Sequence, residues 1–293
     1  MERQTFIVVQ QGYILLTKRG PSPGPLTSVI EYWQPIADHQ RNLMRHFHRL
    51  LLAIAFAALL PAQTAEDLIR RNIQAKGGAD KIKAIQSLRM TGKTQQGSFT
   101  AEIGRDSVAP NLLRQTITLQ GMTSIQAYDG STGWQISPFE GRKDPELLGE
   151  ERLREMVENA DFSGPLVDYQ AKGNTIEYLG HDTVDGDDVH RLKVTLKNGD
   201  IFYYYLDPET FLEIRVERIQ FIRGSVREIF TEPGSYKLVA GVYFPFTIEV
   251  GNKRNPGFRS KVTFDKVEAN VAIDPLEFKM PAAPPAASSQ KEF

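Results

Sequence analysis

From Ser87 onward, apolar and polar residues alternate with a period of two. The alternation is clearest in Leu192–Leu196, Leu212–Val216 and Val242–Val250, where every second side chain is apolar. A period of two places apolar side chains on one face of a strand and polar side chains on the other. Strands of this kind form antiparallel sheets that are packed on one face and solvated on the other. The pattern predicts about ten strands.

Turn dipeptides separate these predicted strands at hairpin spacing. Glycine, proline, asparagine and aspartate adopt the backbone angles that tight turns require. The dipeptides are Asp185-Gly186, Asn198-Gly199, Asp207-Pro208 and Pro233-Gly234. Pro245 lies inside a predicted strand, and because proline has no N–H to donate, it indicates an edge or a bulge there.

Two helices are expected before the strands begin. Residues 66–76 carry Leu68, Ile69 and Ile73 at helical spacing, and Gly77-Gly78 ends this helix. A shorter helix follows, with Ile82 and Ile85 on one side.

A third helix is expected within the series of strands. Asp144 is suited to cap a helix that begins at Pro145. Its apolar stripe consists of Leu153, Met156, Val157 and Ala160. A single amphipathic helix between strands must bury this stripe, most plausibly against the apolar face of the sheet. It is then either a structural plug or a lid over a cavity, and the pattern leaves both open.

The N-terminal region has the order of charged, apolar and small residues that is typical of a secretory signal peptide. Met44 precedes a short basic stretch, eleven apolar residues follow from Leu50 to Leu60, and small residues come next. Eleven residues of helix span about 16 Å, roughly half of the hydrocarbon core of a bilayer. We therefore expect a signal peptide over residues 44–65, with cleavage after Ala62 or Ala65, and export to the periplasm. Residues 1–43 are expected to be a non-native upstream extension or disordered.

Charge and cysteine content narrow the classes of partner. The first 65 residues hold six of the 35 basic and three of the 36 acidic residues, which leaves a net charge of about −4 on the rest. Nucleic acids and anionic membrane surfaces favour basic patches, so neither is expected as a main partner. The chain has no cysteine, which excludes disulfides and lipid attachment at a cysteine. We expect a soluble monomer.

The sequence offers little catalytic chemistry. After residue 65 it has two histidines, His181 and His190, which we expect to face each other across a hairpin whose turn holds Asp185, Asp187 and Asp188. Acidic residues and glycine are ordinary in hairpin turns, so a metal site there is a weak alternative. His-Glu-x-x-His, Gly-x-Ser-x-Gly and a phosphate-binding glycine loop are absent from the sequence. We therefore expect a protein that is not an enzyme and uses no metal or cofactor.

Two segments resemble the LolA/LolB-like family of periplasmic carriers that sort outer-membrane lipoproteins. The first begins with Pro110-Asn111-Leu112-Leu113 and ends with Gly133-Trp134-Gln135-Ile136-Ser137-Pro138-Phe139. The second is Asp274-Pro275-Leu276-Glu277-Phe278-Lys279-Met280-Pro281, which is similar to the last strand and proline stop of that family. The resemblance covers residues 65–281. It implies an α+β, mainly β fold: an incomplete antiparallel barrel of about eleven strands, with helices covering its open side.

The resemblance also implies a function. Such a protein shelters acyl chains of lipoproteins or other lipids in an apolar cavity, and transfers them from an inner-membrane donor protein toward an outer-membrane acceptor. The barrel would span residues 66–280, and residues 281–293 would be a disordered tail. The residues expected to line the cavity are Trp134, Ile136, Phe139, Met156, Val157, Phe244, Phe246 and Ile248.

The sequence departs from the family at one position. The carriers place an arginine just before the Pro-Asn-Leu element, where it hydrogen-bonds the lid shut, and this chain has Ala109 there. Arg105 and Arg114 lie nearby, and neither aligns with the lost arginine. The alternative function is a periplasmic sensor or scaffold of the same fold, whose sheet edge binds a protein partner. A hydrolase that uses strand carboxylates is a third and weaker alternative.

Overall fold

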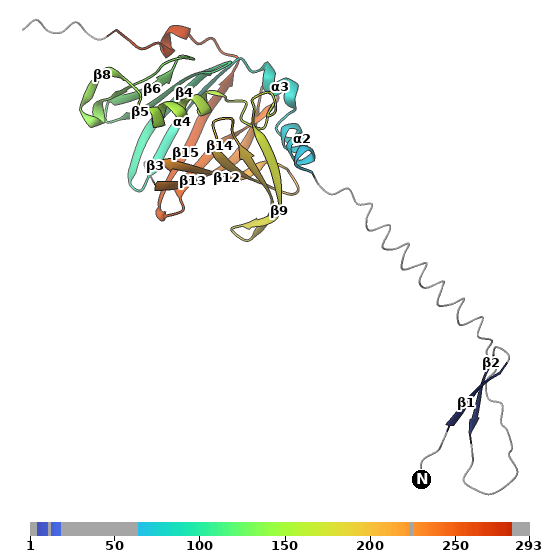
Figure 1. Ribbon diagram of the computed structural model, residues 1–293. Helices are drawn as coiled ribbons and strands as arrows, with labels where there is room; N and C mark the ends of the chain where they lie inside the picture. Colours follow the sequence, from blue (N-terminus) through green and yellow to red (C-terminus); the bar gives the residue numbers. More distant parts are fainter. Residues whose placement is uncertain (1–4, 11–12, 19–63, 223–224, 283–293) are drawn as a thin grey trace, which may run out of the picture. The chain divides into compact units, whose positions relative to one another are not determined.

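The computed structural model describes residues 5–10, 13–18, 64–222 and 225–282 (Figure 1). The chain divides into two units, residues 1–62 and 63–293. In the first unit, β1 (Thr5–Gln10) and β2 (Tyr13–Lys18) form an antiparallel hairpin. Both strands are rich in branched apolar residues, which favour extended backbone. The predicted signal peptide falls almost entirely on residues 44–63, outside the described ranges.

The second unit is a single antiparallel sheet with helices on one face. Its described strands number thirteen. They are β3 (Ser87–Gln96), β4 (Phe99–Val108), β5 (Leu112–Leu119), β6 (Met122–Tyr128), β7 (Gly133–Ser137), β8 (Arg142–Leu147), β9 (Thr175–Val184), β10 (Asp187–Thr195), β11 (Ile201–Leu206), β12 (Glu213–Ile222), β13 (Ser225–Val239), β14 (Val242–Asn252) and β15 (Asn255–Ala269). The helices are α2 (Ala65–Ala75), α3 (Ala79–Ala84) and α4 (Glu150–Ala160), with two short 3-10 turns, η1 (Pro138–Glu140) and η2 (Pro275–Phe278).

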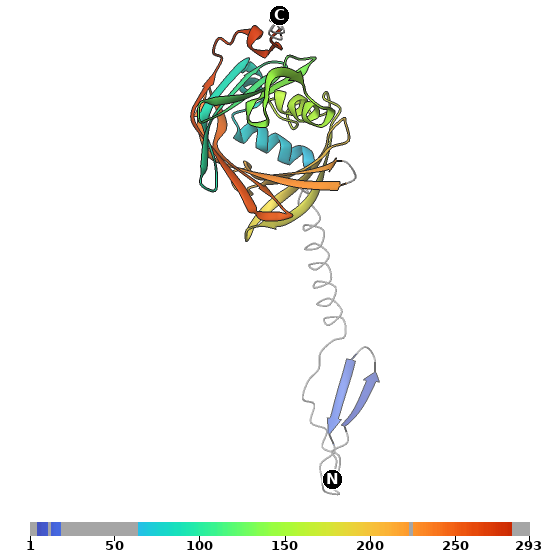
Figure 2. The same ribbon diagram turned by 90° about the vertical axis from the view of Figure 1, so that its left-hand side faces the viewer.

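The strand order leaves the sheet open at one place. Strands β3 to β8 pair in sequence, strands β9 to β15 pair in sequence, and β15 pairs with β3. The edges of the sheet are therefore β8 and β9. The connection between these two edge strands contains α4 and the loop 161–174. Figure 2, in which the strands curve around the centre of this unit, shows α2 and α4 inside the curve.

Apolar packing and one buried ion pair hold α2 on the inner face of the sheet. Leu68 and Ile69 are buried in a cluster with Leu192, Val194 and other residues of β10 and β11. At the end of the helix, Lys76 Nζ lies 2.9 Å from Glu213 Oε1. Burial alone would raise the pKa of Glu213, but the adjacent Lys76 charge holds it below its usual value.

The predicted lid helix begins later than expected. Asp144 and Pro145 lie in β8, not at a helix start, and α4 begins at Glu150 with Gly149 as its N-cap. Strand β8 pairs with β7, and Gln135 Nε2 donates to Glu146 Oε1 at 2.7 Å. Local helix propensity does not reveal this pairing with β7. The pairing favours an extended backbone at Asp144 and Pro145 over the expected first turn of a helix. It also helps to explain why the described strands outnumber those expected.

Pro233-Gly234 does not form a turn, whereas the other predicted turns do separate strands. It lies within the long strand β13, where Pro233 pairs with Ile248 of β14. On its other side, the pairing of β13 with β12 ends at Thr231. Pro233 therefore lies where no neighbour requires its missing N–H. Pro245 is similar: β14 is an inner strand, but it pairs with β15 only over Thr247–Asn252.

The pairing of β3 with β15 depends on a close backbone approach at Gly92. A Cβ atom on Gly92 would lie 2.0 Å from the carbonyl oxygen of Thr263 and 2.7 Å from Phe264 Cα. We expect Gly92→Ala to lower the free energy of unfolding by about 2 kcal/mol or more, because backbone atoms cannot move aside as a flexible side chain can. Urea unfolding measures this change.

Gly257→Ala is the matched control. Gly257 belongs to β15, and its added Cβ would meet nothing closer than Asn255 Oδ1 at 3.7 Å. The free energy of unfolding of Gly257→Ala should stay within about 0.5 kcal/mol of the wild-type value. Equal stability of the two variants would contradict the importance of the close approach at Gly92.

Candidate functional site

A cavity of about 630 Å³ lies beneath α4, on the inner face of the sheet. Residues of β11, β12 and β13 form its floor, α4 and the loop 161–174 lie over it, and Arg105 reaches it from β4. In the strand order, β4 is separated from β13 by β3, β15 and β14. The cavity therefore draws its walls from distant parts of the sheet.

The register of three neighbouring strands builds the floor. Tyr204, Val216 and Thr231 are cross-strand partners, and form one row. Phe202, Arg218 and Ile229 form the next row in the same way. Since paired residues of antiparallel strands point to the same face, both rows face the cavity. The floor is thus mainly apolar and aromatic, and the guanidinium of Arg218 lies 5.4 Å from the ring centre of Phe202.

Helix α4 covers the cavity with one side and packs on the sheet with another. Met156 and Ala160 are buried against Leu113 and Tyr128 of β5 and β6. Val157 lines the cavity and is 44% exposed. At Gly133 the helix comes so close to β7 that a Cβ atom would lie 2.7 Å from Leu153 Cδ1. These contacts pack α4 directly on the inner face of the sheet.

A cluster of charges joins α4 to the floor. Glu158 of α4 forms an ion pair with Arg218 of β12, and Asn198 Nδ2 donates to Glu158 Oε1 at 2.9 Å. The carboxylate of Asp200 lies 3.5 Å from the same arginine, and 3.8 Å from the guanidinium of Arg154 in α4. Burial and a hydrogen bond to Asp200 raise the pKa of Glu158 to about 7, although Arg218 and Asn198 act in the opposite direction. Glu158 is therefore partly protonated near neutral pH.

Arg105 is the second link between α4 and the sheet. Its Nη2 donates to the carbonyl oxygen of Asn159 at 2.6 Å. Its Nε is enclosed and has no acceptor within the described part of the chain. Burial lowers the pKa of Arg105 to about 10, so the guanidinium stays charged at neutral pH. The family resemblance did not single out this residue, because it lies four residues before Ala109 rather than at that position.

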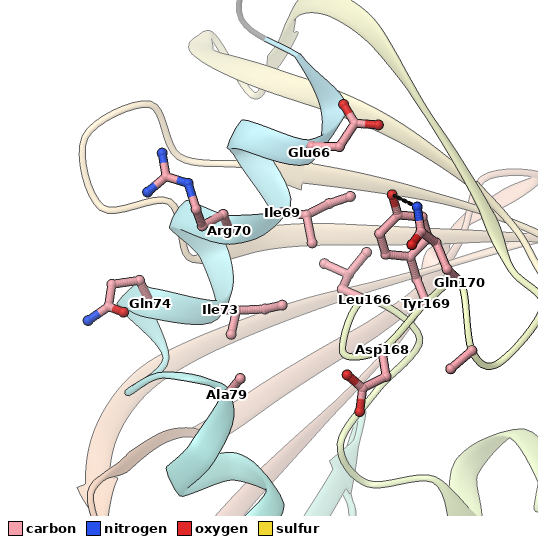
Figure 3. Close-up of a pocket in the computed structure, with 11 residues that line it drawn as sticks. Glu66, Ile69, Arg70, Ile73, Gln74, Ala79, Leu166, Asp168, Tyr169 and Gln170 are labelled. Carbon is pink, nitrogen blue, oxygen red and sulfur yellow. Dashed lines mark hydrogen bonds between the residues drawn. The ribbon is translucent and has the colours of Figure 1, made fainter.

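A shallower groove of about 490 Å³ lies on the other side of the loop 161–174 (Figure 3). Ile69 and Ile73 of α2 face Leu166 of the loop across it, as the figure shows. Charged residues surround these apolar side chains, among them Glu66 and Arg70. The loop thus separates this groove from the cavity beneath α4.

The residues expected to line a cavity are divided among several places. Val157 lines the cavity beneath α4, and Met156 packs on the sheet beside it. Phe246 is buried in an apolar cluster that also contains Met90, and Phe244 and Ile248 pack against it. This cluster lies on the same face of the sheet as the cavity, because Met90 is the cross-strand partner of Arg105, but none of its residues lines the cavity.

Three of the expected residues lie away from the cavity. Trp134 is buried, and its Nε1 donates to the carbonyl oxygen of Phe278 in η2 at 2.7 Å. Gly133 faces α4, so by strand alternation Trp134 and Ile136 point to the opposite face of β7. Phe139 lies in η1 and is 42% exposed. The sequence motif around Trp134 therefore marks the contact with the C-terminal segment, which holds the sheet from outside.

The two histidines are paired across the β9–β10 hairpin, as the sequence predicts. His190 is buried, its Nδ1 lies 3.1 Å from the hydroxyl of Tyr178, and its ring is stacked on Phe211. Burial and the neighbouring His181 and Arg71 lower the pKa of His190. No cluster of three or more potential metal ligands occurs within the described ranges. In the same ranges, no helix has the length and apolar character to cross a membrane.

Comparisons with solved structures find the same architecture. No model of a known protein family matches the sequence, and no curated protein does. A DUF1329 family protein from Desulfovibrio piger aligns with a TM-score of 0.53 at 13% identity, over 74% of this chain and 98% of that one. A LolA superfamily protein from Nitrosomonas europaea gives a TM-score of 0.50 at 16% identity, over 74% and 98%. The chain has the LolA-like fold.

A third structure agrees with this assignment. It is a putative outer membrane lipoprotein-sorting protein domain from Vibrio parahaemolyticus, with a TM-score of 0.50 at 12% identity, over 73% of this chain and 97% of that one. The LolA-like fold expected from the two short sequence segments is thereby confirmed, as is its open, mainly β sheet with helices.

The raised pKa of Glu158 predicts how stability depends on pH. The folded protein retains this proton up to about pH 7, whereas the unfolded chain releases it near pH 4.5. The contribution of Glu158 to stability should therefore fall as the pH rises from 4.5 to 7. Glu158→Gln lacks this titration, so its loss of stability over the same range should be smaller by about 1–3 kcal/mol.

Urea unfolding of the wild type and Glu158→Gln at several pH values checks this difference. Glu155→Gln is the control, because Glu155 also approaches Arg218, at 3.7 Å, from the more exposed side of α4. This control should keep the wild-type dependence on pH. Parallel curves for the wild type and Glu158→Gln would refute the assignment of the titration to Glu158.

Proposed function

We propose that the protein is a non-enzymatic carrier that binds an acyl chain of a lipid or lipoprotein in the cavity beneath α4. The observation that carries this proposal is the cavity itself, whose floor consists mainly of apolar and aromatic side chains from three strands. Its volume of about 630 Å³ lies within the range of about 300–1,000 Å³ that small-molecule pockets occupy. The LolA-like fold agrees with this role.

Burial of an alkyl chain supplies the binding free energy in this proposal. Each methylene that leaves water contributes about 0.8 kcal/mol, so a chain of sixteen carbons offers roughly 12 kcal/mol before ordering costs. No covalent chemistry is needed. A carrier must also release its cargo, and the charged groups around the cavity reduce its affinity for a purely apolar ligand.

Helix α4 acts as the lid in this proposal, with Arg105 and Arg218 as its two latches. Arg105 bonds to a backbone carbonyl of α4, and Arg218 pairs with Glu158 of the same helix. Arg105 thereby takes the role that the resemblance assigns to an arginine at the position of Ala109. The connection from β8 to β9 carries α4 across the open side of the sheet, where a moving lid would admit an acyl chain.

The proposed setting is the periplasm. Its basis is the signal peptide expected from Met44, together with the LolA-like fold. In that compartment the carrier would receive its cargo from an inner-membrane donor protein and deliver it to an outer-membrane acceptor. Thr64 caps α2 by accepting a hydrogen bond from Asp67 N at 3.2 Å, so cleavage after Ala62 would preserve this cap and cleavage after Ala65 would remove it.

Filling the floor of the cavity tests the carrier function. Val216→Trp places a large side chain between Tyr204 and Thr231, so the variant should retain much less lipid than the wild type. Native mass spectrometry of protein purified from a membrane-containing host measures bound lipid. Leu238→Trp is the control, because Leu238 is exposed and lies outside the cavity lining. Consistently bare wild-type protein would count against a lipid cavity.

One observation supports the alternative of a scaffold that binds a protein partner. Within the described part of the sheet, β9 pairs with β10 alone, so one edge of this ten-residue strand presents backbone groups for another strand. Photo-crosslinking from Glu177, an exposed residue of β9, should then capture a protein in the periplasm. In that case the lipid would be missing, and the Val216→Trp variant would behave as the wild type does.

A further inference from the structure

We propose that Arg105 is a binding site for the anionic end of the cargo, so that the preferred ligand is a single alkyl chain that carries a carboxylate or a phosphate. This inference rests on the proposed carrier function, and narrows the class of ligand. Two observations support it: Arg105 lines the cavity, and the other positively charged residues of the lining are already paired with carboxylates.

The other cations that line the cavity already have acidic partners. Lys172 pairs with Asp161, and also donates to Ser163 Oγ at 2.9 Å. Arg218 pairs with Glu158 and lies near further carboxylates. Arg105 forms no ion pair within the described part of the chain, and its hydrogen bond from Nη2 goes to the neutral carbonyl oxygen of Asn159. It is thus the one lining cation in these ranges whose charge no carboxylate balances.

The surroundings of Arg105 fit an amphiphile. Its cross-strand partner on β3 is Met90, which belongs to the apolar cluster around Phe246. Across the cavity lie Phe202, Val216 and Ile229 of the floor. A chain that lies on these side chains has its polar end within the same cavity as the guanidinium. An arginine binds carboxylate and phosphate oxygens more strongly than a neutral carbonyl, because the hydrogen bonds are assisted by charge.

The same geometry couples the ligand to the lid. Nη2 of Arg105 bonds to Asn159, close to the end of α4. An anion that binds at Nη2 competes with this carbonyl oxygen for that nitrogen's donors. Binding of the anionic end at Nη2 therefore loosens one of the two proposed latches while the alkyl chain occupies the floor.

Three ligands with the same twelve-carbon chain test the inference: dodecanoate and dodecyl phosphate below their micelle concentrations, and dodecanol below its aqueous solubility, all at pH 7.5. Isothermal titration calorimetry measures their affinities for the wild type, Arg105→Gln and Arg114→Gln. The wild type should bind at least one anion about tenfold more tightly than the alcohol. In Arg105→Gln this ratio should approach one, while the alcohol still binds.

Arg114→Gln is the matched control. Arg114 lies on the neighbouring strand β5, where Gln115 is the partner of Arg105, so Arg114 points to the other face of the sheet. The change in charge is the same, and the wild-type ratio should persist. A ratio that is measured relative to the alcohol does not change if Arg105→Gln merely loosens α4.

The outcomes separate this inference from the proposed function. Equal affinity of the wild type for all three ligands, or an unchanged ratio in Arg105→Gln, overturns the anion site and leaves the carrier intact. Failure of the wild type to bind any of the three overturns both. Preference for dodecanoate indicates a fatty acid, and preference for dodecyl phosphate indicates a lipid with a phosphate head group; either result supports the site.

Discussion

The structure depends on where the antiparallel sheet is joined and where it is open. β15 pairs with β3, so the first and last strands of the second unit meet, whereas β8 and β9 remain edges. The inner face of such a curved sheet is apolar along every second residue, and must be covered. The chain covers it with α2 at one place and with α4, in the connection between the two edges, at the other. A cavity remains because the single helix α4 does not fill the space above β11, β12 and β13.

Charged side chains line this cavity, whereas an ordinary protein core is apolar. Burying an ion pair costs free energy that a pair of apolar side chains would not cost. Here Glu158, Asp200 and Arg218 nevertheless join α4 to the floor, and Arg105 joins it to β4. Links of this kind are directional and reversible, so they place α4 accurately and would also permit the movement that the proposed carrier function requires. The apolar contacts of Met156 and Ala160 then act as the support on which α4 rests.

Close approaches explain two glycines: Gly92 meets the backbone of β15, and Gly133 meets the side chain of Leu153 in α4. Gly92 lets β3 and β15 meet at a place where the register shifts by one residue. Gly133 lets α4 approach β7. Gly92 affects how closely β3 and β15 pair, and Gly133 affects how closely α4 approaches the inner face of the sheet. The cavity therefore depends on residues that do not line it.

The sequence by itself determined the class of fold. The period of two along the strands, the helical spacing in residues 66–76 and the paired histidines of the β9–β10 hairpin follow from local alternation and turn chemistry, and the structure agrees with them. Two short segments were enough to indicate the LolA-like fold. Local preference was misleading where tertiary pairing overrides it, as in β8 at Asp144 and Pro145 and in β13 at Pro233.

Only the tertiary structure decided which side chains meet. Alternation says that Trp134 and Phe202 each lie on one face of a strand, but not that Trp134 faces the C-terminal segment while Phe202 faces the cavity. It likewise does not reveal that Arg105, rather than a residue at position 109, reaches α4. The physical reason is that these relations depend on the register and curvature of strands far apart in the sequence, which are fixed only when the whole sheet has formed.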